Sequence, residues 1–97
     1  MGQTARISRN NTTITGEPGS RVLTLHRTAI VRETPEGVTF DTGGWFTATT
    51  KVRMNQAMSE WDYPWRVGQC KGVWYARNWQ TEEEIPFNGN LCHVPRS

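Results

Sequence analysis

The sequence predicts an α+β fold in which an antiparallel β-meander is followed by one amphipathic helix and then by a second β-meander. Two observations support this prediction: a single stripe of apolar residues at helical spacing in the middle of the chain, and β-branched or aromatic runs separated by short turn signals on both sides of it. Turns of this length join antiparallel strands, because a parallel pair needs a long crossover connection. We expect the helix to pack on the open face of a curled sheet or partial barrel.

The segment 42–61 contains the helix. Gly43-Gly44 permits a positive φ and lets the chain leave a strand, and Thr49 and Thr50 are residue types that cap helices. Apolar residues then recur at positions i, i+3, i+4 and i+7, namely Met54, Ala57, Met58 and Trp61. We therefore expect a helix of about three turns that begins at Thr49 and Thr50 and turns this stripe toward the core.

Extended segments precede the helix. The β-branched content indicates three or four strands, with the extended segments at residues 11–15, 21–25, 28–33 and 38–40. Gly16-Glu17-Pro18-Gly19 supplies turn chemistry between the first two, and Thr34-Pro35-Glu36-Gly37 fits a type I turn with Pro second and Gly fourth.

Two hairpins are expected after the helix, which Pro64 prevents from continuing. The first joins residues 65–70 and 73–78 through Lys71-Gly72. The second joins residues 83–87 and 91–94 through Asn88-Gly89, although Pro86 restricts its first strand to an edge or an end of the sheet.

The length of 97 residues allows one core. We expect one domain at residues 11–97, after a flexible N-terminus at residues 1–10 that is polar and without periodicity. No apolar run approaches the roughly eighteen residues of a membrane span, and the start of the chain lacks a secretory signal pattern. These features favour a soluble protein that does not bind a membrane.

Charge is unevenly distributed along the chain, although the net charge of +2 is too small to indicate a partner. Basic residues predominate at residues 1–32 and 43–80. Two acidic patches are expected to interrupt this basic surface, one formed by Glu33, Glu36 and Asp41 around a turn and one by Glu82, Glu83 and Glu84.

Residue types suited to catalysis or metal binding are sparse. His26 and His93 are the only histidines, Cys70 and Cys92 are the only cysteines, and their spacing matches no zinc motif. Cys92 and His93 are adjacent, and adjacent side chains of a strand point to opposite faces. We therefore expect no catalytic residue, no metal and no cofactor, and the pairing of Cys70 with Cys92 stays open.

The start of the helix is the first candidate binding site. A helix N-terminus presents free N–H groups and a partial positive charge, and Thr49, Thr50, Lys51 and Arg53 add two hydroxyl groups and two cations. Cations at this end are unfavourable for the helix unless an anion binds, so these four residues predict a phosphate or anion site. The alternative is that both basic side chains extend into water.

Aromatic residues form the second candidate site. Seven aromatic residues in the middle of the chain are more than a core of this size can hold, so some of them should be partly exposed. The seven are Trp45, Phe46, Trp61, Trp65, Trp74, Tyr75 and Trp79. Core packing is the expectation for Trp45 and Trp61. A surface that stacks nucleic-acid bases or contacts a protein is the expectation for Trp79, Tyr75, Arg66 and Arg77.

Several motifs mark the lineage of the chain. They are Leu25-His26-x-Thr28-x-Ile30-Val31, Phe40-Asp41-Thr42-Gly43-Gly44-Trp45, Thr47-x-Thr49-Thr50-Lys51-x-Arg53-Met54-Asn55-Gln56, Lys71-Gly72-Val73-Trp74-Tyr75 and Ile85-Pro86-Phe87-Asn88-Gly89. Across residues 21–89 the sequence resembles a group of small proteins of tailed bacteriophages. The resemblance implies a phage gene product that works in the bacterial cytoplasm or in the virion, and it implies no particular chemistry.

We therefore expect a non-enzymatic phage protein that acts by binding. Nucleic acid is the leading partner, contacted as a single strand or through its backbone. A host-takeover or anti-defence inhibitor that binds a host bacterial protein is the alternative, and a minor virion component is the third. No small-molecule substrate is indicated, a homo-oligomer stays open, and the host bacterial cytoplasm is the expected location, with the virion as the alternative.

Overall fold

The computed structural model describes residues 12–96. The N-terminal segment 1–10, expected to be flexible, lies outside the described residues. The elements in chain order are β1 (Thr12–Thr15), β2 (Val22–Leu25), β3 (Thr28–Thr34), β4 (Gly37–Asp41), α1 (Ala48–Glu60), β5 (Trp65–Cys70), β6 (Val73–Asn78), β7 (Glu84–Pro86) and β8 (Leu91–Pro95).

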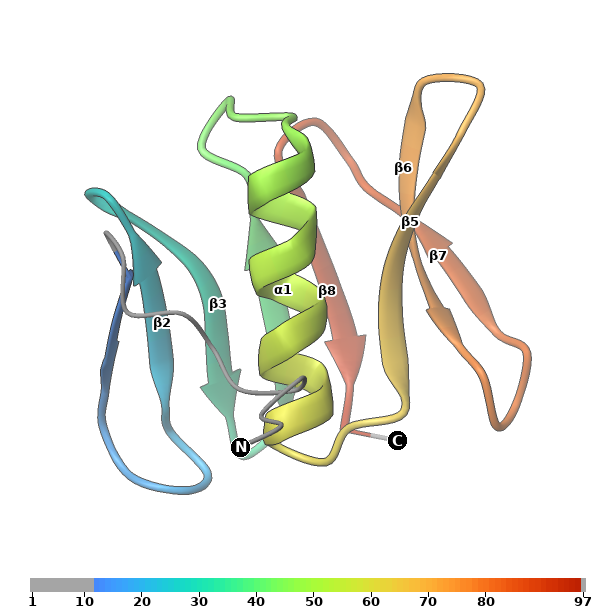
Figure 1. The fold of residues 1–97 in the computed structure, drawn as a ribbon. Coiled ribbons are helices and arrows are strands. Elements are labelled where there is room, and N and C mark those ends of the chain that lie inside the picture. Colours follow the sequence, from blue (N-terminus) through green and yellow to red (C-terminus); the bar gives the residue numbers. More distant parts are fainter. Residues whose placement is uncertain (1–11, 97) are drawn as a thin grey trace, which may run out of the picture.

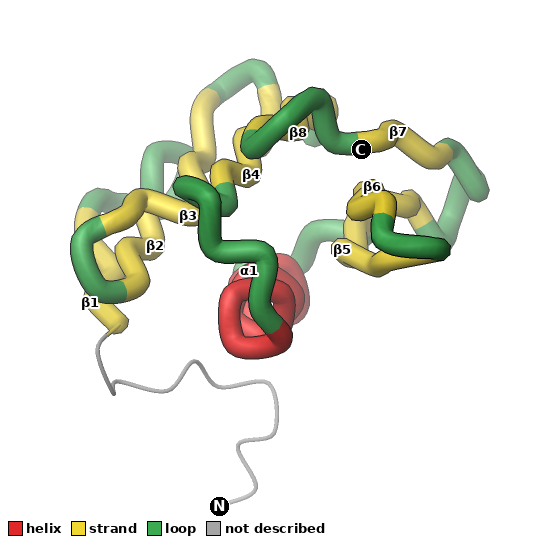
Figure 2. The backbone as a smooth tube through the Cα atoms, turned by 90° about the horizontal axis from the view of Figure 1, so that it is seen from above, coloured by secondary structure: helices red, strands yellow, loops and turns green. Residues whose placement is uncertain are grey.

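Two antiparallel sheets flank the helix (Figure 1). The first has the strand order β1-β2-β3-β4-β8, and the second has the order β5-β6-β7. Seen from above in Figure 2, the strands follow an open arc, and α1 lies across its opening. The α+β prediction is confirmed. The arc is not closed into a barrel, because no described strand of the first sheet pairs with a strand of the second.

The last strand differs from the prediction. Asn88-Gly89 does form a tight turn, in which the Asn88 N–H donates to the Leu91 C=O at 2.7 Å, but the segments on its two sides enter different sheets. β7 pairs with β6, whereas β8 pairs with β4. Alternate residues of β8 face the core, so the crossing to the first sheet buries Cys92 and Val94.

The helix begins earlier than expected, at Ala48. Thr47 is the N-cap residue, because its backbone is extended (φ −116°, ψ 162°) and its side-chain oxygen accepts a hydrogen bond from the Thr50 N–H. Three threonines in this segment have suitable side chains, and only Thr47 has the backbone conformation of a cap. Thr49 and Thr50 therefore lie inside the first helical turn.

The predicted apolar stripe faces the core. All four of its residues are buried, namely Met54, Ala57, Met58 and Trp61. The helix ends where Asp62 adopts a left-handed conformation (φ 63°) and the Tyr63 N–H donates to the Met58 C=O at 2.8 Å. This Schellman-type ending satisfies a carbonyl that the last turn would otherwise leave unpaired.

Trp45 does not pack in the core, so that prediction was wrong. Its side chain is 57% exposed. The largest fully buried side chains already fill the space between α1 and the sheets, and they include Trp65, Phe40, Leu23, Ile30, Met54 and Met58. Trp45 instead lies in the loop 42–47, where its backbone N–H donates to the Thr42 C=O at 2.9 Å. Gly43 permits this turn with φ 62°, and it passes so close to Thr28 that a Cβ atom would come within 2.5 Å of the Thr28 methyl group.

Asn55 attaches the helix to the second sheet. Its side-chain Oδ1 accepts a hydrogen bond from the Val67 N–H at 2.7 Å, and its Nδ2 donates to the Val67 C=O at 3.0 Å. Val67 belongs to β5, an edge strand of that sheet. One amide side chain thus satisfies the same two backbone groups that a neighbouring strand would. The contact fixes one face of the sheet toward the core and leaves the opposite face to solvent.

Candidate nucleic-acid interface

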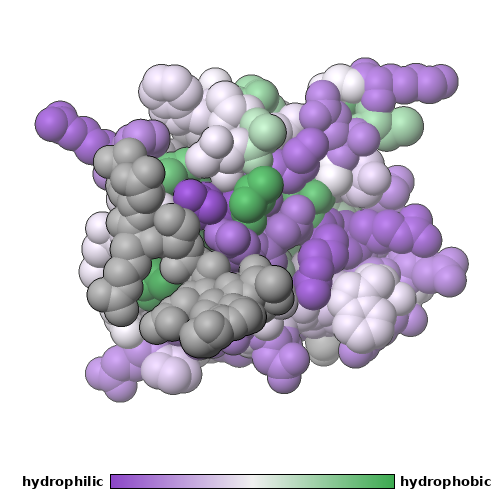
Figure 3. Space-filling model, viewed as in Figure 1, coloured by the Kyte–Doolittle hydropathy of each residue, from purple (hydrophilic) through white to green (hydrophobic). Residues whose placement is uncertain are grey.

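The outer face of the β5-β6-β7 sheet brings together three of the predicted site residues. Alternate side chains of β5 and β6 are buried, whereas Arg66, Tyr75 and Arg77 are half-buried or exposed. The register places Arg66 opposite Arg77 and Gly68 opposite Tyr75. In the view of Figure 3, hydrophilic side chains gather on the side of the molecule where Figure 1 places β5 and β6.

The Tyr75 side chain leans across the neighbouring strand onto Gly68. A Cβ atom at Gly68 would come within 2.7 Å of the Tyr75 hydroxyl oxygen and within 2.8 Å of the ring carbon that carries it. Only glycine leaves room for this ring position. The hydroxyl end of the ring therefore lies over the Gly68 backbone, and the residue as a whole is half-buried.

Two arginines face each other across the strands beside this ring. The Arg66 guanidinium donates through Nη1 to the Trp65 C=O at 2.7 Å and to the Tyr63 C=O at 3.1 Å, which fixes its position. The Arg77 Nη1 atom lies 3.8 Å from the Glu84 carboxylate oxygen Oε2, and both side chains of this pair are about half exposed. Like charges directly opposite each other destabilise a sheet. A negatively charged ligand between Arg66 and Arg77 would relieve this repulsion.

Trp79 lies next to the arginine end of the sheet. Its backbone N–H donates to the Pro64 C=O at 3.0 Å, and this bond extends the pairing of β6 with the start of β5 by one residue. The turn that follows is held by Asn78, whose side-chain oxygen accepts from the N–H groups of Gln80 and Thr81. The Trp79 side chain is 59% exposed. A large aromatic ring is thus held near Arg66 on a backbone with fixed hydrogen bonds.

The four residues predicted at the helix start do not converge. Thr49 is exposed, whereas Thr50 is buried and its hydroxyl group shares a hydrogen bond of 3.1 Å with the hydroxyl of Thr47. Lys51 donates to Gln69 of β5 at 3.2 Å.

Arg53 turns to the opposite flank of the helix, toward the first sheet. It donates through Nε to the Thr12 hydroxyl oxygen at 3.3 Å and through Nη1 to the Gln56 side-chain oxygen at 3.2 Å. Lys51 and Arg53 are therefore separated by the body of the helix. One phosphate at the helix end cannot lie between them.

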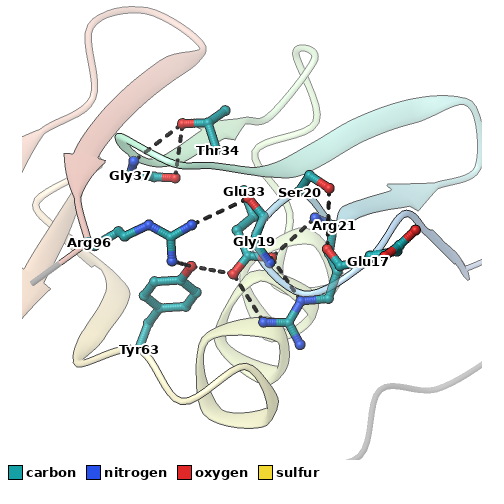
Figure 4. A network of polar contacts seen from close by, with 9 residues as sticks. All are labelled: Glu17, Gly19, Ser20, Arg21, Glu33, Thr34, Gly37, Tyr63 and Arg96. Atoms are coloured by element: carbon teal, nitrogen blue, oxygen red, sulfur yellow. Dashed lines mark hydrogen bonds and ion pairs between the residues drawn. The ribbon is translucent and has the colours of Figure 1, made fainter.

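Glu33, predicted to be part of an exposed acidic patch, is buried. The residue is 4% exposed, because β3 places it at the centre of a polar network that joins the β1–β2 turn with Tyr63 and with Arg96 after β8 (Figure 4). One carboxylate oxygen accepts from the N–H groups of Gly19 and Arg21 and from Arg21 Nε at 2.8 Å. The other accepts from Arg21 Nη2 and from the Tyr63 hydroxyl. Arg96 completes the network by donating to the Tyr63 hydroxyl oxygen at 2.9 Å.

The pKa values in this network are strongly shifted. The hydrogen bonds from Arg21 are the largest cause that lowers the pKa of Glu33, with further bonds from Tyr63 and two backbone amides, to about 2. Burial, followed by the bond to Glu33, raises the pKa of Tyr63 to about 12. Shifted pKa values often mark active sites. Here every oxygen of the carboxylate is occupied by groups of the protein, so the network stabilises the fold.

The remaining titratable candidates lie apart. Cys70 is exposed and Cys92 is buried, and the structure holds both as free thiols. Burial raises the pKa of Cys92 to about 11, which makes its thiolate scarce at neutral pH. His93 shares a hydrogen bond of 2.8 Å with the Thr39 hydroxyl group. Between residues 12 and 96, no group of three potential metal ligands comes together, and no helix has the length and apolarity to cross a membrane.

Sequence reasoning missed two residues that shape the interface. Gly68 gives the Tyr75 ring its space, and the available signal was an isolated glycine inside a strand, which often marks close approach of another group. Asn55 orients the sheet on the helix, and it carried no signal because it looked like any polar residue beside the apolar stripe.

Comparison with known proteins places this chain in a phage lineage. A family model described as Kyanoviridae Gp96 protein matches residues 1–93. The chain therefore belongs to this phage family, which confirms the resemblance to small proteins of tailed bacteriophages. No curated protein and no solved structure matches the chain.

Proposed function

We propose that this phage protein is non-enzymatic and binds single-stranded nucleic acid on the outer face of the β5-β6-β7 sheet. The observation that carries the proposal is the Tyr75 ring, which lies on Gly68 beside the opposed pair Arg66 and Arg77. In this proposal the protein works in the host bacterial cytoplasm, and the virion is the alternative.

The residues suit the two interactions that hold a single strand. An aromatic face stacks on a base at roughly 1 to 3 kcal/mol per base, without sequence preference. Arginines beside that face neutralise the phosphates, and they release counterions in doing so. Trp79, with its exposed ring next to Arg66, offers a second stacking position in the direction of the strands.

Comparison of the two predicted sites favours the sheet over the helix start. On the sheet, both cations and an aromatic ring share one solvent face. At the helix start, Lys51 and Arg53 point to opposite flanks, and the Thr50 hydroxyl is already paired. Of these two sites, the sheet is therefore the one where a phosphate could meet both cations on one face.

Removal of both arginines should reduce the electrostatic part of binding. We expect Arg66→Gln combined with Arg77→Gln to weaken binding of a mixed-sequence single-stranded oligonucleotide at low salt. The slope of log affinity against log salt should fall by about 1 to 2, since single strands contribute roughly 0.7 per phosphate neutralised. Tyr75→Ala should lower affinity by about 1 to 3 kcal/mol and leave the slope unchanged. Fluorescence anisotropy across a salt series measures both quantities.

A matched control removes the same charge elsewhere. Arg27 and Arg32 are exposed and lie in the first sheet or its turn, so Arg27→Gln combined with Arg32→Gln should leave the slope close to that of the unchanged protein. Thermal unfolding of each variant checks that the fold is retained. Equal loss of slope in both double variants, or no oligonucleotide binding by the unchanged protein, would contradict the proposal.

A further inference from the structure

Exposed apolar side chains gather at the end of the molecule where the helix begins. In Figure 1 this end contains the β2–β3 turn, the loop 42–47, the β5–β6 turn and the turn before β8. These segments and the ends of the strands beside them carry the exposed apolar residues Trp45, Phe46, Val73 and Leu91. We call this set the Trp45 surface. Exposed apolar side chains that gather in one region often mark interaction sites.

Hydrogen bonds hold the loop that presents Trp45. The Thr42 N–H donates to the Asn90 C=O at 2.9 Å, and the Thr42 hydroxyl donates to the Asn90 side-chain oxygen at 3.2 Å. The Gly44 N–H donates to the Thr42 hydroxyl oxygen at 3.1 Å. Phe46 packs edge to face on Trp74, with ring centroids 5.3 Å apart. The loop backbone and the Phe46 ring are thus held in place before any partner binds, which lowers the entropy cost of binding.

A cavity lies beside Trp45. Its volume is about 250 Å³, and it is lined by Leu25, His26, Ile30, Trp45, Thr47, Thr49 and Thr50. An apolar cavity of about 150 Å³ holds a benzene ring. The cavity is therefore large enough for one aromatic or branched aliphatic side chain, with Leu25 and Ile30 at its base in the core.

The charges around the Trp45 surface are mainly positive. Arg27 follows His26 in the turn at the cavity, Lys51 lies on the first turns of α1, and Lys71 is in the β5–β6 turn. The first turn of α1 contains no acidic residue, so the partial positive charge of the helix end is not compensated there. An acidic residue, Asp41, lies at the end of β4 beside the loop 42–47, and its carboxylate accepts a hydrogen bond from the Gly43 N–H at 2.8 Å.

From this cavity and these charges we infer that the Trp45 surface docks an acidic segment of another protein, and that one large apolar side chain of the segment enters the cavity. Carboxylates on either side of that side chain would meet Arg27 and the start of α1. Arg66, Arg77 and Trp79 lie toward the opposite end of the molecule (Figure 1), whereas Tyr75 is on the strand that also carries Val73. The inferred docking depends on the cavity and on the charges at the start of α1, and it requires none of the residues proposed to bind nucleic acid.

Two other occupants fit less well. A second copy of the chain, docked symmetrically through this end, would bring Arg27, Lys51 and Lys71 against the same cations of its partner, and like charges at an interface oppose association. A nucleic-acid base would bury hydrogen-bonding edges against a lining that is mostly apolar, and unpaired polar groups are costly. An acidic peptide avoids both costs.

Selection from a random peptide library tests the inference. The full chain is immobilised, and bound peptides are recovered and sequenced. We expect enrichment of peptides in which one large apolar residue is flanked by Asp or Glu. Affinity of a selected peptide should fall roughly tenfold or more with Trp45→Ala, which removes a ring of the kind that dominates interfaces, and with Thr49→Trp, which places a large side chain at the cavity from an exposed position.

The matched control is Trp79→Ala, because Trp79 is as exposed as Trp45 and lies at the other end. It should leave peptide affinity unchanged. The inference is overturned if the library yields no enrichment, if enriched peptides carry basic flanks, or if they bind Trp45→Ala and Thr49→Trp as tightly as the unchanged protein. Loss of oligonucleotide binding with Trp45→Ala, without any peptide binding, would assign the surface to nucleic acid instead.

Discussion

Replacing Glu33 with Gln is expected to lower the free energy of unfolding by about 3 kcal/mol, the lower end of the range for breaking a buried ion pair. The substitution keeps the shape of the side chain and removes its charge. Arg21 then loses its carboxylate, and the bonds from Gly19, Tyr63 and the Arg21 backbone lose a charged acceptor. The lower end applies because the Arg21 side chain is 22% exposed and can regain water. Urea unfolding at neutral pH measures the change.

The control for this substitution is Glu36→Gln, since Glu36 is exposed in the neighbouring turn. It should change stability by less than about 0.5 kcal/mol. If Glu33→Gln also changes the free energy of unfolding by less than about 0.5 kcal/mol, the carboxylate does not hold the β1–β2 turn and Tyr63 together in solution.

The same network predicts how the free energy of unfolding depends on pH. The pKa of Glu33 is lowered on folding from an ordinary 4.5 to about 2, so the folded state favours the ionised form. This contribution is present above pH 4.5 and is lost as the pH falls from about 4.5 to about 2. Unfolding curves across this range should therefore decline more steeply for the unchanged protein than for Glu33→Gln, and parallel curves would contradict the assignment.

Met58→Ala is expected to cost about 2 to 5 kcal/mol, because it truncates a fully buried side chain on the core face of α1. Neighbouring side chains are held by the helix on one side and by strands on the other, so the cavity can collapse only in part. Gln56, on the flank of the helix, is the matched control and should cost less than about 1 kcal/mol when changed to Ala. The reverse order in thermal unfolding would show that the helix presents another face.

The sequence was most informative where local rules act alone. The spacing of Met54, Ala57, Met58 and Trp61 predicted the buried face of α1, because helical periodicity needs no knowledge of the partner. The helix start was predicted at Thr49 and Thr50, whereas Thr47 is the cap. All three threonines have a side chain suited to capping, and only the backbone conformation of the folded chain decides among them.

Long-range choices escaped local reasoning. The turn at Asn88-Gly89 was predicted correctly, but whether β8 pairs with β7 or with β4 depends on which strand edge is free. The burial of Glu33 depends on Arg21 and Tyr63, which come from distant segments and reach it only in the folded chain. Trp45 is exposed because other side chains fill the core first, and the sequence does not reveal that competition.

The candidate site was predictable in its residue types and not in its location. Arg66, Tyr75 and Arg77 were grouped as arginines interleaved with aromatic residues, and strand alternation places the three on one face of the sheet; their role in binding stays a prediction. The helix-start residues were grouped by proximity in sequence, but residues two apart on a helix point in nearly opposite directions. The role of Gly68 could be seen only once Tyr75 was placed opposite it.

The outer face of the β5-β6-β7 sheet and the Trp45 surface could act together. The sheet surface would hold a nucleic acid near Arg66 and Arg77, and the Trp45 surface would hold a protein at the start of α1. A protein built in this way could connect a nucleic acid with a protein partner, and loss of either surface should leave the other active.

The most direct test of the sheet as a nucleic-acid interface is a residue-resolved NMR titration of the labelled protein with a single-stranded oligonucleotide at low salt. We predict that the backbone amide signals of Arg66, Gly68, Tyr75 and Arg77 shift together with increasing oligonucleotide and return when salt is added. Signals of the loop 42–47 should stay in place. Shifts confined to that loop or to the start of α1, or unchanged signals on β5 and β6 while the oligonucleotide is bound, would contradict the account.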